Sequence, residues 1–311
     1  VGVIGHWRGA RWGRVTGQAE AVRYAPRRSF HLPAPLHPSA GAIPAEGIDP
    51  DPAKAPQRMS TPTATTFDEV QAIVADVEGW MTPGQARRLW TCARTVRPGR
   101  TIVEIGSFRG RSMVVLASAA EPGVDVVAID PHAGNDRGPH EFEGYEEAAS
   151  EDHDVFTANL AAAGVADRVR HVRKFSHDAL VDVPGEIDLL YIDGAHRLRP
   201  ALDDIRRWSV KVRPGGDVLI HDSFSSVGVT GAISASLLFS PAWRYLGRSE
   251  SMTHYRREPL AGVGERGANV GRQLASLPWF LRNLVIKGLI LGKLGFLTQP
   301  LFGHDPATWP H

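Results

Sequence analysis

The residues with the clearest chemical potential lie in a glycine-bearing turn within the segment TIVEIGSFRGRS at 101–112. An apolar run contains Glu104, and Gly106 and Gly110 follow before a predicted helix. Glycines at a strand-to-helix turn let the backbone approach a ligand closely, and the helix start offers unpaired N–H groups. The turn lacks the dinucleotide pattern G-x-G-x-x-G, and a carboxylate at 104 would repel a pyrophosphate. It therefore suits a ligand that carries a positive charge beside the turn.

Acids and imidazoles end the other predicted strands. Asp130 ends VDVVAID, where an acid can accept both hydroxyls of a ribose. Asp193 ends IDLLYID, with His196 three residues later, and DVLIHD ends in His221 and Asp222. Because the carboxyl ends of parallel strands meet at one edge, these side chains should converge at the ligand. The alternatives are a solvated loop aspartate at 130 and a helix-capping histidine at 196.

The elements that must position these side chains alternate along the chain. Apolar runs rich in valine and isoleucine occupy 101–106, 124–130, 169–175, 187–193 and 217–222. Helical candidates occupy 111–120, 143–163, 197–212 and 229–239, and two further strand candidates follow at 243–248 and 252–257. This alternation predicts a doubly wound α/β fold with a mostly parallel, seven-stranded, Rossmann-like sheet. Pro214, Gly215 and Gly216 are predicted to form the return turn before the 217–222 strand.

Two helices are predicted ahead of the sheet. Apolar residues recur at helical spacing from Phe67 to Val77. Thr82 followed by Pro83 is typical of an N-cap and a first helical position, which opens a helix to about Val96.

Composition excludes some function classes. The 311 residues carry a formal charge of +1, which gives no general attraction to nucleic acid. Cys92 is the single cysteine, so an internal disulfide is impossible and a cytoplasmic location is expected. At helical spacing Cys92 falls on an apolar face, so we interpret it as a buried core thiol.

The chain divides into four predicted parts. Residues 1–58 hold eight prolines, eight basic and four acidic residues, and no sustained periodicity. We interpret them as a disordered extension or a mis-assigned start, with a basic arm for an anionic partner as the alternative. The N-terminal helices take 59–100, the ligand-binding domain 101–260, and an apolar, basic tail 261–311.

Four motifs in order, VEIGSFRGRS, VVAIDPH, YIDGAH and RPGGDVLIHD, carry a family resemblance over about 85–255. The chain resembles the class I S-adenosylmethionine-dependent methyltransferases. It is most similar to the branch of small-molecule and sugar O-methyltransferases, such as those that methylate macrolide sugars. S-adenosylmethionine carries an ammonium group and a sulfonium, which agrees with the positive charge expected at the turn.

The resemblance implies roles for the residues of the turn and of the neighbouring strand tips. Asp130 would bind the ribose, and Ser176 would lie near the adenine. The positions implied to hold the methionine part of the cofactor are Glu104, Gly106, Ser107 and Gly110.

The resemblance also implies a divalent metal at the strand tips, with Asp193 and Asp222 at the matching positions. Two carboxylates suit Mg²⁺, whereas an imidazole from His221 would suit Zn, Ni or Fe better. His221 is therefore either a third ligand or a structural group. His196 is the candidate base that takes the proton of a hydroxyl acceptor, with Asp193 beside it in the catalytic set.

The tail at 276–302 is apolar but contains Arg282, Lys287 and Lys293. Three alternatives remain open. It packs on the domain or across a homo-oligomer, it lies in a membrane interface as a basic amphipathic helix, or it forms a mobile lid. Interfacial binding would fit a lipid-linked glycan acceptor.

The functional prediction is methyl transfer to a hydroxyl of a sugar, glycoside or other small molecule. The polar loop at 132–146, with His132, His140 and Tyr145, is expected near the acceptor. The alternatives are an NAD-linked oxidoreductase and a non-catalytic, membrane-associated protein that retains the fold.

Overall fold

The computed structural model describes residues 66–133 and 146–306, with the side chains of 146–150 left out. The predicted extension at 1–58 and the loop residues His140 and Tyr145 lie outside these ranges. The strands are β1 (Thr101–Ile105), β2 (Asp125–Ile129), β3 (Val169–Val172), β4 (Ile187–Ile192), β5 (Val212–Ile220), β6 (Trp243–Ser249) and β7 (Met252–Arg257). They form one seven-stranded sheet in the order β3-β2-β1-β4-β5-β7-β6. All pairs are parallel except those that β7 makes with β5 and β6. The predicted doubly wound α/β fold is confirmed.

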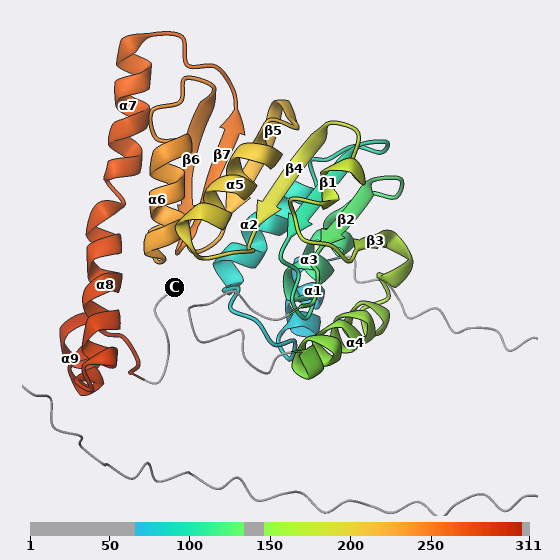
Figure 1. Ribbon diagram of the computed structural model, residues 1–311, viewed down its shortest axis with the longest axis horizontal. Helices are drawn as coiled ribbons and strands as arrows, with labels where there is room; N and C mark the ends of the chain where they lie inside the picture. The colour runs from blue at the N-terminus through green and yellow to red at the C-terminus, as the bar shows by residue number, and fades with distance from the viewer. Residues whose placement is uncertain (1–65, 134–145, 307–311) are drawn as a thin grey trace, which may run out of the picture. The chain divides into compact units, whose positions relative to one another are not determined.

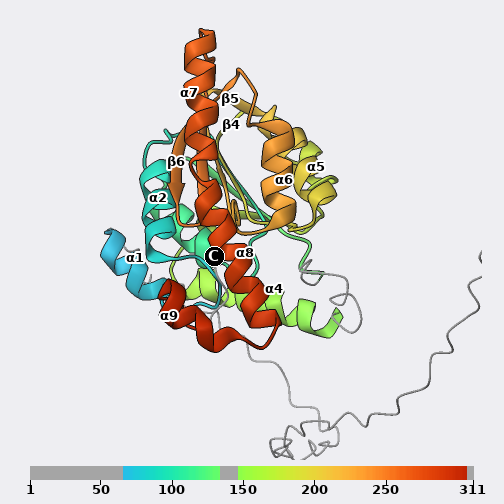
Figure 2. The same ribbon diagram turned by 90° about the vertical axis from the view of Figure 1, so that its left-hand side faces the viewer.

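Helices cover both faces of the sheet (Figures 1 and 2). One face packs against α1 (Phe67–Val74), α2 (Pro83–Ala93), α3 (Arg111–Ala119) and α4 (Glu146–Ala162). The other packs against η3 (Ala179–Val181), α5 (Leu198–Ser209) and α6 (Val227–Ser236). The short turn η2 (Ala166–Arg168) leads into β3. Because both faces are covered, the central strands are apolar on both sides, and all six residues of β4 are buried.

The N-terminal helices start where the sequence predicts. Thr66 caps α1 and Thr82 caps α2, each in a reciprocal capping box with the residue three positions later. Helix α2 ends at Ala93, short of the predicted Val96.

The prediction of a return turn at Pro214, Gly215 and Gly216 is wrong, because these residues lie inside β5. The strand starts at Val212, and its register with β4 shifts between Ile187 and Leu189. Gly216 passes so close to β4 that a Cβ atom there would lie 3.0 Å from the carbonyl oxygen of Asp188. Glycine at 216 therefore lets the strand continue past this shift in register, although the sequence pattern predicts a turn there.

The C-terminal region forms four short elements: α7 (Val263–Leu274), α8 (Leu277–Leu291), η4 (Gly295–Leu297) and α9 (Thr298–Phe302). Helix α7, which the sequence pattern did not predict, runs beside β6 at the edge of the sheet (Figure 1). Its glycine-rich sequence disfavours an isolated helix, and contacts with the sheet stabilise it. Asn269 accepts from the backbone of Tyr245 and donates to that of Trp243.

Candidate functional site

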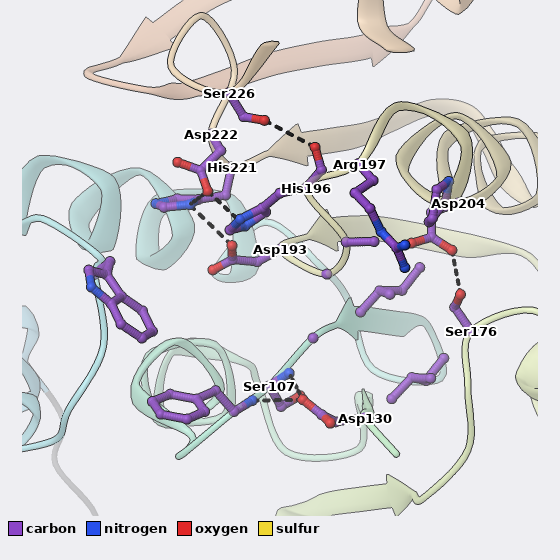
Figure 3. A pocket seen from close by; sticks show the side chains of 18 of the residues that line it. Ser107, Asp130, Ser176, Asp193, His196, Arg197, Asp204, His221, Asp222 and Ser226 are labelled. Atoms are coloured by element: carbon purple, nitrogen blue, oxygen red, sulfur yellow. Dashed lines mark hydrogen bonds and ion pairs between the residues drawn. The ribbon is translucent and has the colours of Figure 1, made fainter. Parts of the chain in front are cut away.

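The carboxyl ends of β1, β2, β4 and β5 border a cavity of about 1150 Å³. Such a volume can hold a nucleoside-sized cofactor together with a second small molecule. Within the described residues, the site residues singled out in the sequence line this cavity or form its glycine turn, except Glu104; Figure 3 shows its central side chains.

The glycine turn is held by close contact with the neighbouring strand tips. The N–H of Gly106 donates to the carbonyl of Ile129 at 2.9 Å. At Gly106 φ is +84°, and a Cβ atom would lie 2.3 Å from the carbonyl oxygen of Asp193. Gly110 caps α3 in the left-handed region, and a Cβ there would meet the ring of Phe156. Both glycines are therefore required by the backbone geometry.

Asp130 holds the glycine turn from the tip of β2. Its Oδ2 accepts from the backbone N–H groups of Ser107 and Phe108, both at 2.8 Å (Figure 3). Its Oδ1 accepts from the backbone N–H of His132 at 2.7 Å. The carboxylate thus lines the cavity and orders the turn at the same time.

His132, expected near the acceptor, supports the same turn. Its ring is buried, and Nε2 lies 2.8 Å from the carbonyl oxygen of Phe108. The ring packs among Phe156, His153 and His171. Its position therefore favours a structural contribution to the cofactor end of the cavity.

Glu104 lies behind the turn, outside the cavity wall. Its side chain is fully buried and makes no hydrogen bond within the described part of the chain. Burial, and then the nearby charges of Asp193 and Asp130, raise the pKa of Glu104 to about 8, although the hydroxyls of Ser107 and Ser112 act in the opposite direction. The role of Glu104 as a direct ligand of the cofactor thus stays a prediction, and its position favours an influence through the turn.

Ser176 lines the cavity at the end far from Asp193 and Asp222, and it donates to Asp204 of α5 (Figure 3). Burial raises the pKa of Asp204 to about 6, although Ser176 and the nearby cations oppose the change. Sequence reasoning missed Asp204, because an acid inside an amphipathic helix is usually interpreted as part of the solvated face.

Four side chains from the tips of β4 and β5 form one compact cluster (Figure 3). Nε2 of His196 lies 2.8 Å from Oδ2 of Asp222. Nδ1 of His221 lies 3.1 Å from Oδ1 of Asp193 and 3.5 Å from Oδ2 of Asp222. Tyr191 donates from its hydroxyl to Asp193 at 3.0 Å. The predicted convergence of two carboxylates and two imidazoles is confirmed by these distances.

The two imidazoles of the cluster differ in environment. His221 is almost fully buried, and its Nε2 lies 3.3 Å from Oε1 of the buried Gln85. Burial alone would lower the pKa of His221, but the carboxylates of Asp193 and Asp222 outweigh it and raise the pKa well above its usual value. The side chain of His196 is 26% exposed and borders the cavity. His196 is therefore the imidazole that an acceptor can reach.

A divalent cation would find three ligand atoms here, from Asp193, His196 and Asp222, all within 4.8 Å of one another. His221 does not belong to this set. Its ring nitrogens face Gln85 and the two carboxylates, so its geometry favours a structural role over the ligand role considered from the sequence.

Lys287 of α8 reaches the cavity from the C-terminal region. Its Nζ donates to the carbonyl oxygen of Ser225 at 2.9 Å and to its hydroxyl at 3.1 Å. Burial lowers the pKa of Lys287, and Asp222 opposes that change. In the sequence this lysine looked only like a charge that interrupts an apolar tail, so its place in the cavity wall was missed.

Residues 103–223 match the family model of a methyltransferase domain. This chain carries a methyltransferase domain. A methyltransferase domain agrees with the S-adenosylmethionine cofactor expected from the acid-bearing glycine turn. The match does not favour the NAD-linked alternative or the non-catalytic one.

One curated protein that matches this chain is distant in sequence. An uncharacterised protein of Acanthamoeba polyphaga mimivirus is 26% identical over 127 residues, which are 39% of this chain. The match spans about half the length of that relative, 51%.

Solved structures with a similar fold include three O-methyltransferases. NovP is 18% identical, with 61% of this chain and 88% of its own covered and a TM-score of 0.48. TomG from Streptomyces achromogenes, in complex with S-adenosylmethionine, is 21% identical, with 61% and 86% covered and a TM-score of 0.41. An O-methyltransferase from Bacillus cereus is 20% identical, with 62% and 90% covered and a TM-score of 0.42.

Proposed function

We propose that this protein transfers the methyl group of S-adenosylmethionine to a hydroxyl of a sugar, glycoside or other small molecule, in the cytoplasm. The observation that carries the proposal is the acid–imidazole cluster of Asp193, His196 and Asp222. It borders the same cavity as the glycine turn and as Asp130, so that a donor and an acceptor can lie side by side.

The cofactor half is proposed as follows. Gly106, Ser107 and Gly110 admit the methionine part, Asp130 accepts the ribose hydroxyls, and Ser176 lies beside the adenine. Two features support this assignment: the turn has backbone room only for glycine, and the Asp130 carboxylate is already oriented by backbone N–H groups.

The acceptor half is proposed to work through His196. Bound S-adenosylmethionine would supply a methyl group activated by the adjacent sulfonium. The acceptor oxygen forms a bond to the methyl carbon as the carbon–sulfur bond breaks, so the hydroxyl proton must leave. His196, which Asp222 orients at Nε2, is the group proposed to take this proton.

Metal assistance is a separate part of the proposal. A divalent cation on Asp193, His196 and Asp222 would lower the pKa of the acceptor hydroxyl and orient it. His196 would then be a ligand instead of the base. Because the set includes an imidazole, a transition metal fits it better than Mg²⁺.

Titration of S-adenosylhomocysteine into the full chain by calorimetry tests the proposal. We expect micromolar binding that Asp130→Ala weakens strongly, and unchanged binding in Val210→Ala, an exposed position remote from the cavity. A folded protein that binds no S-adenosylhomocysteine would overturn the cofactor site. Repeating the titration with EDTA and then with Zn²⁺ or Mg²⁺ determines whether a metal affects the binding of S-adenosylhomocysteine.

A further inference from the structure

Helix α8 presents an apolar face to solvent and a partly polar face to the domain. Leu277, Leu281 and Val285 follow one another at four-residue spacing and are exposed by 40%, 59% and 49%. On the opposite side, Asn283 donates to the carbonyl of Phe224, and Lys287 donates to Ser225. A surface helix of a soluble domain normally shows the reverse arrangement. The exposed row of α8 is therefore adapted to an apolar surrounding.

The exposed apolar surface continues beyond α8 into η4 and α9, which follow it directly at the C-terminal end of the described chain (Figures 1 and 2). Leu291, Phe296 and Leu301 are exposed by 74%, 67% and 63%. We call the whole set the α8–α9 face; it comprises Leu277, Leu281, Val285, Leu291, Phe296 and Leu301. Many exposed large apolar side chains on consecutive elements are typical of an interaction site.

The charge of this region selects the kind of partner. No acidic residue occurs between Glu265 and Asp305, whereas this stretch contains Arg266, Arg272, Arg282 and Lys293 in addition to Lys287 of the cavity wall. Glu265 itself is paired with Arg244. Exposed apolar side chains within a purely basic segment complement a surface that is apolar inside and anionic outside.

We propose that the α8–α9 face docks on the surface of an anionic lipid bilayer, with its apolar side chains inserted among the lipid headgroups. A second copy of the chain fits less well, because a two-fold interface would bring the same basic segments together. The proposal does not depend on the methyltransferase assignment.

The contacts of α7 favour docking at the membrane surface over a helix that crosses the bilayer. By length and composition alone, the span Val263–Leu291 could cross a membrane, and 17% of its most apolar window is buried. However, Asn269 and Gln273 of α7 are buried and hydrogen-bonded to Tyr245 and Tyr255 of the sheet. If this helix crossed the bilayer, these hydrogen bonds would break, and the polar side chains would have no partners in the hydrocarbon.

The test is co-sedimentation of the full chain with vesicles of phosphatidylcholine containing phosphatidylserine, and with phosphatidylcholine vesicles alone. Wild type should bind the anionic vesicles more tightly, and added salt should weaken the binding. The double variant Leu281→Gln, Val285→Gln should bind about tenfold or more weakly, since two inserted side chains are lost. The matched control is Val181→Gln, Val210→Gln, which changes two valines exposed by 78% and 68% on other elements and should bind like wild type.

Both double variants retain residues 1–58, so binding through that basic segment does not change between them. Equal binding of wild type and Leu281→Gln, Val285→Gln, with circular dichroism showing both folded, would overturn the proposal. So would failure of wild type to sediment with anionic vesicles. A dimer in analytical ultracentrifugation that the same variant dissociates, without vesicle binding, would assign the face to a second copy instead.

Discussion

At the scale of single residues, the site depends on buried ionisable groups whose charges compensate one another. His221 lies against both Asp193 and Asp222, and these carboxylates raise its pKa and so favour its charged form. This arrangement lets two carboxylates share one strand edge. It also leaves His196 as the more exposed imidazole beside the cavity.

Replacement of His196 tests the proposed base. His196→Gln should lower the rate of methyl transfer by about 10²–10⁴-fold, the usual contribution of a general base. Binding of S-adenosylhomocysteine should remain unchanged, because the cofactor half of the cavity is separate. If EDTA abolishes the activity of wild type and added metal restores it, the loss of activity in His196→Gln indicates that His196 is a metal ligand and not the base.

Glu104 should make stability depend on pH. Its pKa is about 8 in the folded protein and 4.5 ordinarily, so folding favours the protonated form. The stabilisation is fully present below pH of about 4.5 and is lost as pH rises through about 8. Between pH 5 and pH 8, the free energy of unfolding measured in urea should fall by on the order of a few kcal/mol more for wild type than for Glu104→Gln. If the free energy of unfolding changes equally with pH in the two proteins, the raised pKa assigned to Glu104 is contradicted.

Cys92 should be unreactive in the native protein. Burial, and then the charge of Asp217, raise the pKa of Cys92 to about 12, so little thiolate forms at neutral pH. Its Sγ lies 3.9 Å from His254, whose Nε2 faces Asp217 at 3.1 Å. Ellman's reagent at pH 8 should label the unfolded chain and leave the folded one unlabelled. Rapid labelling of the folded protein would contradict the interpretation as a core thiol.

At the scale of elements, close approach of backbones decides which loops can form the site. The carbonyl of Asp193 lies where a Cβ at Gly106 would be, so β4 and the glycine turn are in direct contact. A second close approach joins α6 to the loop that carries His196. At Gly228 a Cβ atom would lie 2.2 Å from the carbonyl oxygen of His196.

Gly228→Ala should therefore displace the loop of His196. We expect methyl transfer to fall by at least about tenfold, while binding of S-adenosylhomocysteine changes little. The control is Gly267→Ala in α7, where a Cβ would meet nothing within 4 Å. This control should be neutral or more stable by about 0.5–1 kcal/mol, because alanine favours a helix. Wild-type kinetics in Gly228→Ala would show that the loop adapts.

At the scale of the whole molecule, we propose that the helices at 59–100 and the domain at 101–260 form the catalytic unit. Within the described residues, one apolar cluster joins α1 and α2 to α3 and to the sheet. Gln85 of α2 also contacts His221 in the site. The tail supplies Lys287 to the cavity wall, so it belongs to the same unit.

A chain that begins at Met59 should bind S-adenosylhomocysteine with the affinity of the full chain, as measured by calorimetry. The reason is that every proposed cofactor contact lies between 104 and 176. Weaker binding by the shorter chain, if it remains folded, would assign a role in the site to residues 1–58.

Much of the fold, and the grouping of the strand-tip residues at one cavity, could be predicted from the sequence, because both depend on local signals. Strand–helix alternation, Thr82 with Pro83, and the glycines of the turn each indicate structure through neighbours a few residues away. The acids at the strand tips were found in the same way, since parallel strands deliver their carboxyl ends to one edge.

Tertiary structure alone decided which side chains meet across the chain. Asp204, Gln85 and Lys287 reach the site from helices whose local pattern shows only amphipathic or apolar faces. It also placed both imidazoles against the aspartates: His221 is buried between Asp193, Asp222 and Gln85 of a distant helix, and His196 lies beside Asp222 at the cavity. Such contacts depend on packing between elements far apart in sequence, and no short pattern of residue types records them.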